Sequence, residues 1–160
     1  MLNMTPLPVE FRDLLSSFNG QGLKYLVVGG WAVGHHGYKR HTVDIDFWIA
    51  VSPENADRLI GAFLEFCGSA PTKRSIVEGR KTTEFGVEPL KVHIMCDISG
   101  VEFEDCYGKR VEADWDGVRV PIIGLNDLLK NKSATGRLKD QADVEALVKR
   151  HELTKRKKKK

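Results

Sequence analysis

Two segments in the first half of the chain carry apolar residues at the three- and four-residue spacing of an amphipathic helix. The first runs over Phe11–Phe18 and is followed by Asn19-Gly20, a pair that ends helices. The second has its apolar stripe at Ala56, Leu59, Ile60, Phe63 and Leu64. Ser52-Pro53 supplies an N-cap and a proline at the first helical position, and Gly68 follows the end. We therefore expect a helix in each segment.

Other apolar segments have the character of β-strands. Tyr25–Val28 is wholly apolar and ends at Gly29-Gly30, so it predicts a short buried strand. Val43–Val51 alternates, so Asp44, Asp46 and Trp48 face one side of a strand and Val43, Ile45, Phe47 and Ile49 face the other. The remaining pattern predicts a short helix over Trp31–His36 and two strands within Thr82–Met95, interrupted near Glu88-Pro89. It also predicts a hairpin over Val111–Ile123 that turns at Asp116-Gly117. Two closing helices are expected over Leu125–Lys132 and Asp140–Lys149, separated by the polar stretch Ser133–Lys139.

This order of elements predicts a mixed α/β (α+β) fold, a small mixed sheet flanked by helices. The 160 residues suit one domain, which we expect to span residues 1–152. Residues 155–160 are all Lys or Arg, and without them 19 basic residues face 22 acidic ones. A block of like charge without apolar partners predicts a disordered basic tail over residues 153–160. The tail is interpreted as solvated, with contact to RNA phosphates as the alternative.

The cysteines and the hydropathy bear on location. Cys67, Cys96 and Cys106 are odd in number and have no metal-type spacing, so they fit reduced thiols of a cytosolic protein. No segment approaches the roughly 20 apolar residues of a membrane span. The first residues lack the basic-then-apolar pattern of a signal peptide. These features predict a cytoplasmic protein without a membrane partner.

The candidate chemistry lies between residues 27 and 47. A strand that ends in Gly29-Gly30 lets the backbone approach a ligand closely, and the helix that follows presents free amides to phosphate. Asp44 and Asp46 project from one face of a strand, where paired carboxylates repel each other unless a divalent cation lies between them. A nucleoside triphosphate (NTP) with magnesium fits both halves of this arrangement. The alternative without a function is that Asp44 and Asp46 form the polar face of an edge strand.

These residues resemble the minimal nucleotidyltransferases of the DNA polymerase β superfamily, and more narrowly the bacterial stand-alone proteins related to toxins and abortive-infection proteins. The resemblance spans roughly residues 25 to 148. The matching blocks are Gly29-Gly30-Trp31-Ala32, His36-Gly37, Arg40-His41-Thr42-Val43-Asp44-Ile45-Asp46, Ser99–Glu104, and Lys132 through Gly136–Asp140 to Asp143. A nucleotidyltransferase fold is therefore expected.

The resemblance implies transfer of a nucleoside monophosphate (NMP) from an NTP to a hydroxyl of a protein, an RNA or a small molecule, with release of pyrophosphate. Gly29 and Gly30 would hold the triphosphate, and Asp44 and Asp46 would bind Mg²⁺ or Mn²⁺. Arg40, Lys132, Arg137 and Lys139 are the expected nucleotide-binding cations; a solvated surface position is the alternative for each. A partner protein, such as an antitoxin, would fit the same resemblance.

One position departs from the pattern. The third carboxylate of the family falls at His93, and imidazole suits magnesium poorly. His93 can instead act as a base toward a hydroxyl. Asp97, four residues further on, is the other candidate, and a bulge or bend would be needed to bring it into place. The alternative function is a catalytically weakened nucleotide-binding or regulatory module, part of a toxin–antitoxin pair.

Two further interpretations concern the histidines and tryptophans. His35, His36 and His41 lie near Asp44 but match no common zinc spacing, so His36 is expected to pack or cap at the end of its helix. Trp31 and Trp48 are expected in the core rather than stacked on a base.

Overall fold

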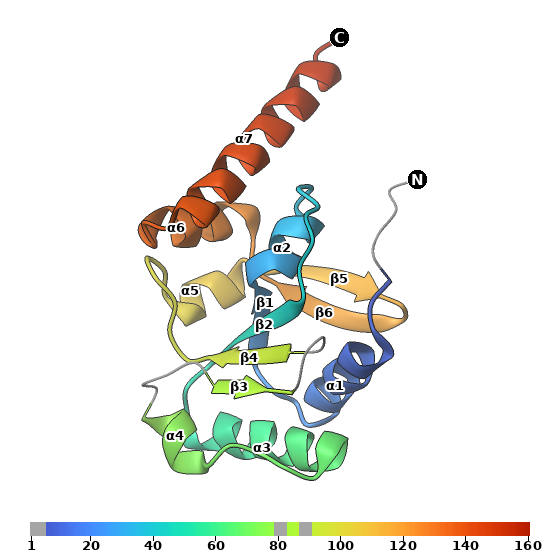
Figure 1. Cartoon of the computed structure of the whole chain (residues 1–160), viewed down its shortest axis with the longest axis vertical. Coiled ribbons are helices and arrows are strands. Elements are labelled where there is room, and N and C mark those ends of the chain that lie inside the picture. The colour runs from blue at the N-terminus through green and yellow to red at the C-terminus, as the bar shows by residue number, and fades with distance from the viewer. Residues whose placement is uncertain (1–5, 79–82, 87–90) are drawn as a thin grey trace.

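A single six-stranded mixed sheet forms the middle of the protein (Figure 1). The computed structural model describes residues 6–78, 83–86 and 91–160. The strands are β1 (Tyr25–Val28), β2 (Asp44–Ile49), β3 (Thr83–Phe85), β4 (Lys91–Met95), β5 (Val111–Trp115) and β6 (Val118–Ile122), in the spatial order β3-β4-β2-β1-β6-β5. The pairs β2–β4 and β1–β6 are parallel and the other three are antiparallel. The predicted mixed α/β fold is confirmed.

Seven helices are present in the described residues. They are α1 (Val9–Gly20), α2 (Gly29–His35), α3 (Pro53–Cys67), α4 (Lys73–Val77), α5 (Phe103–Gly108), α6 (Leu125–Ala134) and α7 (Leu138–Lys158). Helix α3 begins as predicted, since the Ser52 side chain accepts a hydrogen bond from the Asn55 amide and Pro53 is the first helical residue. Gly68 ends it in the left-handed conformation. Helices α4 and α5 are too short to show a periodic pattern, and the sequence did not predict them.

The two faces of β2 lie in different surroundings. On one face, Phe47 packs with Phe18 of α1 at a ring-centroid distance of 4.9 Å, and Phe18 also contacts Phe63 of α3. On the other face, Trp48 is buried against Phe103 of α5, with centroids 5.1 Å apart. The alternation predicted for this strand therefore holds. It leaves Asp44 and Asp46 on the face that α1 and α3 do not cover.

Several helix bounds differ from the predicted ones: α1 includes the predicted stop Asn19-Gly20, α6 ends at Ala134 rather than Lys132, and the bounds of α2 and α7 bear on the site. Helix α2 begins at Gly29 rather than Trp31, so the two glycines form its first turn. Helix α7 begins at Leu138 rather than Asp140 and continues to Lys158, so residues 153–158 are helical where a disordered tail was predicted. Lys and Arg favour helix, and their cations at a helix C-terminus complement its dipole. The helix thus crosses residue 152, the predicted end of the domain.

Candidate active site

The diglycine turn and Asp46 lie directly against each other. Antiparallel pairing of β1 with β2 sets Val28 opposite Asp46, and Gly29 follows with a φ of 65°. A Cβ atom at Gly29 would overlap the Asp46 carboxylate. Both the backbone conformation and the neighbouring carboxylate therefore require glycine at position 29.

The second glycine is fixed by the chain that returns from α2 to β2. A Cβ atom at Gly30 would lie 2.5 Å from Thr42 Oγ1 and 3.5 Å from Arg40 Nη1. The Thr42 hydroxyl donates a hydrogen bond of 3.3 Å to the backbone carbonyl of Asp44. The close packing at Gly30 thus brings Arg40 to the diglycine turn.

Asp44 has an oxygen without a partner. Its Oδ1 atom is buried and accepts no hydrogen bond in the part of the chain that the structure describes, whereas Oδ2 lies 3.9 Å from His93 Nε2. A buried carboxylate oxygen is rarely left unsatisfied in proteins, and a hard cation is a natural partner for it. Among residues 6–78, 83–86 and 91–160, no three His, Cys, Asp or Glu side chains form a ready-made metal-binding group. Magnesium commonly takes one or two carboxylates and completes its shell with substrate phosphates, so the donors present fit that ion.

His93 lies beside both aspartates. Parallel pairing of β2 with β4 sets His93 opposite Asp46, and His93 Nδ1 lies 2.9 Å from Asp46 Oδ1. Burial raises the pKa of Asp46, and the nearby Asp44 raises it further, whereas His93 acts in the opposite direction; the net shift is upward. Burial therefore disfavours the ionised form of Asp46, and the imidazole of His93 stabilises it.

Glu84 is a nearby acidic residue that the sequence analysis missed. It stands opposite His93 in the antiparallel pairing of β3 with β4, and its Oε2 lies 3.3 Å from His93 Nε2. The paired residue numbers are centred between 88 and 89, so a tight hairpin assumed at the predicted interruption is the one sequence signal that could have indicated this neighbour. Glu88-Pro89 itself lies outside the described residues.

Helices α6 and α7 contribute a buried network of charges. Lys132 is 6% exposed, and its Nζ lies 2.9 Å from Asp140 Oδ1 and 3.1 Å from Asp143 Oδ2. Arg40 makes two hydrogen bonds to Asp143, and Arg137 lies 2.8 Å from Asp140. Burial alone would raise the pKa of Asp140, but hydrogen bonds from Thr135, Lys132 and Arg137 lower it to about 2. Asp140 and Asp143 together hold three of the predicted nucleotide-binding cations, Arg40, Lys132 and Arg137.

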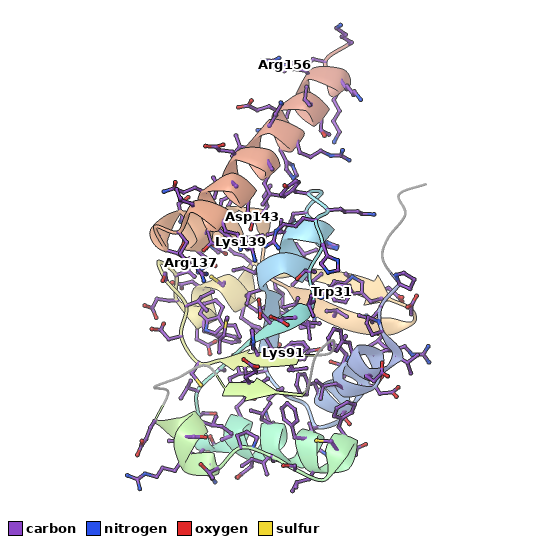
Figure 2. The ribbon with its side chains drawn as sticks, viewed as in Figure 1. Trp31, Lys91, Arg137, Lys139, Asp143 and Arg156 are labelled. Atoms are coloured by element: carbon purple, nitrogen blue, oxygen red, sulfur yellow. The ribbon has the colours of Figure 1, made fainter. Side chains whose placement is uncertain are left out.

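All nine predicted site residues line one cavity of about 590 Å³, a volume typical of small-ligand sites. They are Gly29, Gly30, Arg40, Asp44, Asp46, His93, Lys132, Arg137 and Lys139. Arg137, Lys139 and Asp143 lie together at the beginning of α7 in Figure 2. Asp97 also lines the cavity, just beyond the end of β4. The structure thus brings together segments from residue 29 to residue 140.

The histidine and tryptophan interpretations are in line with the structure. His36 Nε2 lies 2.7 Å from the backbone carbonyl oxygen of Ile123, so His36 packs at the end of α2. Trp31 contacts the rings of Phe11 and Trp115. Neither Trp31 nor Trp48 is among the residues that line the cavity.

None of the described helices combines the length and apolar character needed to cross a bilayer.

Comparison with known proteins identifies the fold. No protein-family model matches the chain, and no curated protein matches it. Among solved structures, a proposed nucleotidyltransferase from Thermotoga maritima is similar with a TM-score of 0.54 and 15% identity, covering 92% of this chain and 98% of that one. The lincosamide antibiotic adenylyltransferase LnuA, solved with lincomycin bound, has a TM-score of 0.55 and 15% identity, covering 89% and 96%.

An antigenic nucleotidyltransferase-like protein from Paracoccidioides brasiliensis has a TM-score of 0.51 and 13% identity, covering 88% of this chain and 73% of that one. At these identities the likeness concerns the fold. The chain has the minimal nucleotidyltransferase fold, as the resemblance implied.

Proposed function

We propose that this protein transfers an NMP from an NTP to a hydroxyl acceptor and releases pyrophosphate. The observation that carries the proposal is the contact of the Asp46 carboxylate with Gly29 inside one cavity that also holds Asp44 and four cationic side chains. A turn of backbone amides and cations suits the triphosphate, and adjacent carboxylates suit the metal that accompanies it. No single one of these features would be specific alone.

Asp44 and Asp46 are the residues proposed to hold Mg²⁺ or Mn²⁺. Both supply hard oxygen donors, and the unpartnered Oδ1 of Asp44 is the atom that most needs a cation. When bound, such an ion neutralises phosphate charge and stabilises the charge that develops in the transition state. Gly29 and Gly30 offer the backbone amides of the first turn of α2 to the triphosphate.

The cations of α6, α7 and the loop before β2 would bind the phosphates. Arg40 lies at the diglycine turn, while Lys132 and Arg137 are held by Asp140 and Asp143. A guanidinium kept in place by a carboxylate loses little entropy when it binds phosphate. Lys139 is exposed and lines the same cavity, so it can move to meet a ligand.

His93 is the proposed base. In the reaction, the hydroxyl oxygen bonds to the α-phosphorus, and the bond from this phosphorus to the oxygen bridging to the β-phosphate breaks. With the Nδ1 proton donated to Asp46, Nε2 is the nitrogen that can accept the hydroxyl proton. The Glu84 carboxylate 3.3 Å from Nε2 would stabilise the imidazolium that forms.

The test is transfer of label from each of the four NTPs, beginning with ATP because the similar LnuA is an adenylyltransferase. The protein is incubated with labelled NTP, Mg²⁺ or Mn²⁺, and total cell extract. Incorporated label that disappears in Asp44→Asn supports the transferase, and release of pyrophosphate provides an independent readout.

A second candidate function follows from the Asp46–His93 contact. The imidazole occupies a carboxylate oxygen that a metal would otherwise take, which favours a nucleotide-binding regulatory module, as in a toxin–antitoxin pair. Metal-dependent NTP binding without incorporation or pyrophosphate release would favour this module over the transferase.

A further inference from the structure

The second half of α7 is strongly basic and stands apart from an acidic body. Between residues 149 and 160 the basic residues are Lys149, Arg150, Lys155, Arg156, Lys157, Lys158, Lys159 and Lys160, and Glu152 is the one acidic residue. Every one of these side chains is exposed. Without residues 155–160 the chain has more acidic than basic residues. Such asymmetry indicates a polyanionic partner.

The helix leaves the body near His151. Leu147 is fully buried, and His151 Nε2 lies 2.9 Å from the backbone oxygen of His36. Beyond this contact, residues 152–160 are exposed, and Figure 1 shows α7 projecting past α2. Figure 2 places Arg156 at the far end of α7 and Lys139 at its beginning. A helix of this length spans about 30 Å, because each residue adds about 1.5 Å.

The far end of α7 carries more positive charge than is needed to stabilise the helix through its dipole. Cations in the last turn complement the helix dipole, but this effect falls off within that turn. Like charges three and four residues apart repel each other. In the described structure no carboxylate forms an ion pair with residues 155–160. This end therefore carries a positive potential that the protein does not neutralise.

The apolar residues in the second half of α7 indicate whether its polyanionic partner is a nucleic acid or a membrane surface. A helix that lies in a lipid interface needs a continuous apolar face with Trp, Phe or Leu. Beyond residue 148, Leu153 is the one large apolar side chain, and it is 48% exposed. Charge without an apolar face fits a phosphate backbone better than a lipid surface.

We infer that α7 docks RNA along its basic half and directs the 3′ end into the cavity, where the terminal hydroxyl is the acceptor. This inference rests on the proposed function. The helix starts at the cavity with Arg137 and Lys139 and ends in the basic segment, so one strand can contact both. The 3′ oxygen would bond to the α-phosphorus, pyrophosphate would leave, and the hydroxyl proton would pass to His93.

The test compares the full chain with a variant in which Lys155, Arg156, Lys157, Lys158, Lys159 and Lys160 are replaced by Gln, a good helix former. The probe is a labelled hairpin RNA with an A-form stem as long as α7 and a single-stranded 3′ end, and its binding is measured by fluorescence anisotropy over a salt series. We expect the Kd of the variant to rise at least about 10-fold at low salt. The slope of log Kd against log salt should fall by about 2 or more, because each lost phosphate contact removes about 0.7 to 0.9. Glu152→Gln, the matched control on the same helix, should bind RNA at least as tightly as the parent.

The second arm measures transfer of labelled NMP to the same RNA, with a 3′-phosphate version as the blocked acceptor. Labelling of the 3′-hydroxyl form alone, reduced in the six-residue variant, supports the inference. Equal RNA affinity and salt slope in the variant and the parent would overturn it. So would tail-dependent capture of phosphatidylserine vesicles without RNA binding, or label that enters extract proteins but never RNA.

Calorimetry with NTP and Mg²⁺ separates this inference from the function on which it rests. The six-residue variant should bind NTP as the parent does, since none of the replaced residues lines the cavity. If neither protein binds NTP with Mg²⁺ or Mn²⁺, the proposed function fails, and the anisotropy arm still decides whether α7 is an RNA-docking surface.

Discussion

Arg40 and Asp143 are 103 residues apart in the sequence and are joined by two hydrogen bonds of 2.8 and 3.0 Å. Asp143 is 1% exposed and also receives Lys132 Nζ at 3.1 Å. Because Nε and Nη2 both donate to the Asp143 carboxylate, the planar guanidinium has one orientation, in which Nη1 lies on the side of Gly30. Asp143 therefore connects the closing helices to the diglycine turn of the candidate site.

The first prediction concerns Asp143→Asn. An amide cannot balance Arg40 and Lys132, and removal of one partner from a buried ion pair destabilises by about 3 kcal/mol or more. We expect urea unfolding to show a loss of this order. NTP affinity measured by calorimetry should also fall, because Arg40 loses its fixed orientation.

The matched control is Glu145→Gln, an exposed acid on the same helix. It should change unfolding free energy by less than about 0.5 kcal/mol. If Asp143→Asn binds NTP as tightly as the parent does, the positioning of Arg40 by Asp143 has no role in binding.

The second prediction compares Gly29→Ala with Gly22→Ala. The two glycines have similar positive φ values of 65° and 70°, but a Cβ at Gly22 meets nothing within 4 Å, whereas one at Gly29 overlaps the Asp46 carboxylate. In both variants the backbone strain should lower the free energy of unfolding by about 1 kcal/mol. Gly29→Ala alone should also lose metal-dependent NTP binding, measured by calorimetry. Equal NTP affinity in the two variants would show that the Gly29–Asp46 contact is unimportant for binding.

The third prediction concerns His93→Asp. Aspartate can replace imidazole as the base, and its carboxylate is also a harder metal ligand, so Mg²⁺-dependent turnover should rise and the preference for Mn²⁺ over Mg²⁺ should fall. The control is His93→Asn, which supplies a neutral oxygen and should not raise turnover. Unchanged metal affinity and rate in His93→Asp would show that position 93 does not approach the ion.

The fourth prediction concerns Asp140 and pH. Its folded pKa of about 2 lies below the ordinary value of 3.8, so its ionised form favours the folded state. The resulting stability, about 2 kcal/mol, is present above about pH 4 and is lost as the pH falls toward 2. Urea unfolding at pH 6, 4 and 3 should therefore show a difference between the parent and Asp140→Asn that shrinks on acidification. A difference that stays constant with pH would mean that Asp140 does not ionise more readily in the folded protein.

The sequence predicted those elements whose pattern is long or strictly alternating. The stripe from Ala56 to Leu64 and the alternation around Asp44 and Asp46 gave α3 and β2 close to their bounds. Helices α4 and α5 have only five and six residues, less than two turns, so they carry no periodic signal. The basic end of α7 has little apolar pattern, and its repulsion favoured disorder over the helix that the preceding turns propagate.

For the candidate site, the structure places the nine predicted residues around one cavity, but the sequence did not predict their partners. The nine predicted residues share one cavity because their strands and helices follow from the local pattern. Glu84 was missed because it lies on a three-residue strand and gains meaning only from its register with His93. The pairing of Lys132 with Asp140 and Asp143 likewise depends on how α6 packs against α7, which no spacing rule supplies.

The Arg40–Asp143 pair also bears on how the chain matures. During synthesis, Gly29, Arg40 and Asp46 leave the ribosome about one hundred residues before the carboxylate that orients Arg40. Contacts between such distant segments form slowly, because the loop must close before they stabilise anything. A nascent chain therefore contains β1, β2 and the acidic pair well before it contains Asp143, and the candidate site is completed only when α7 docks.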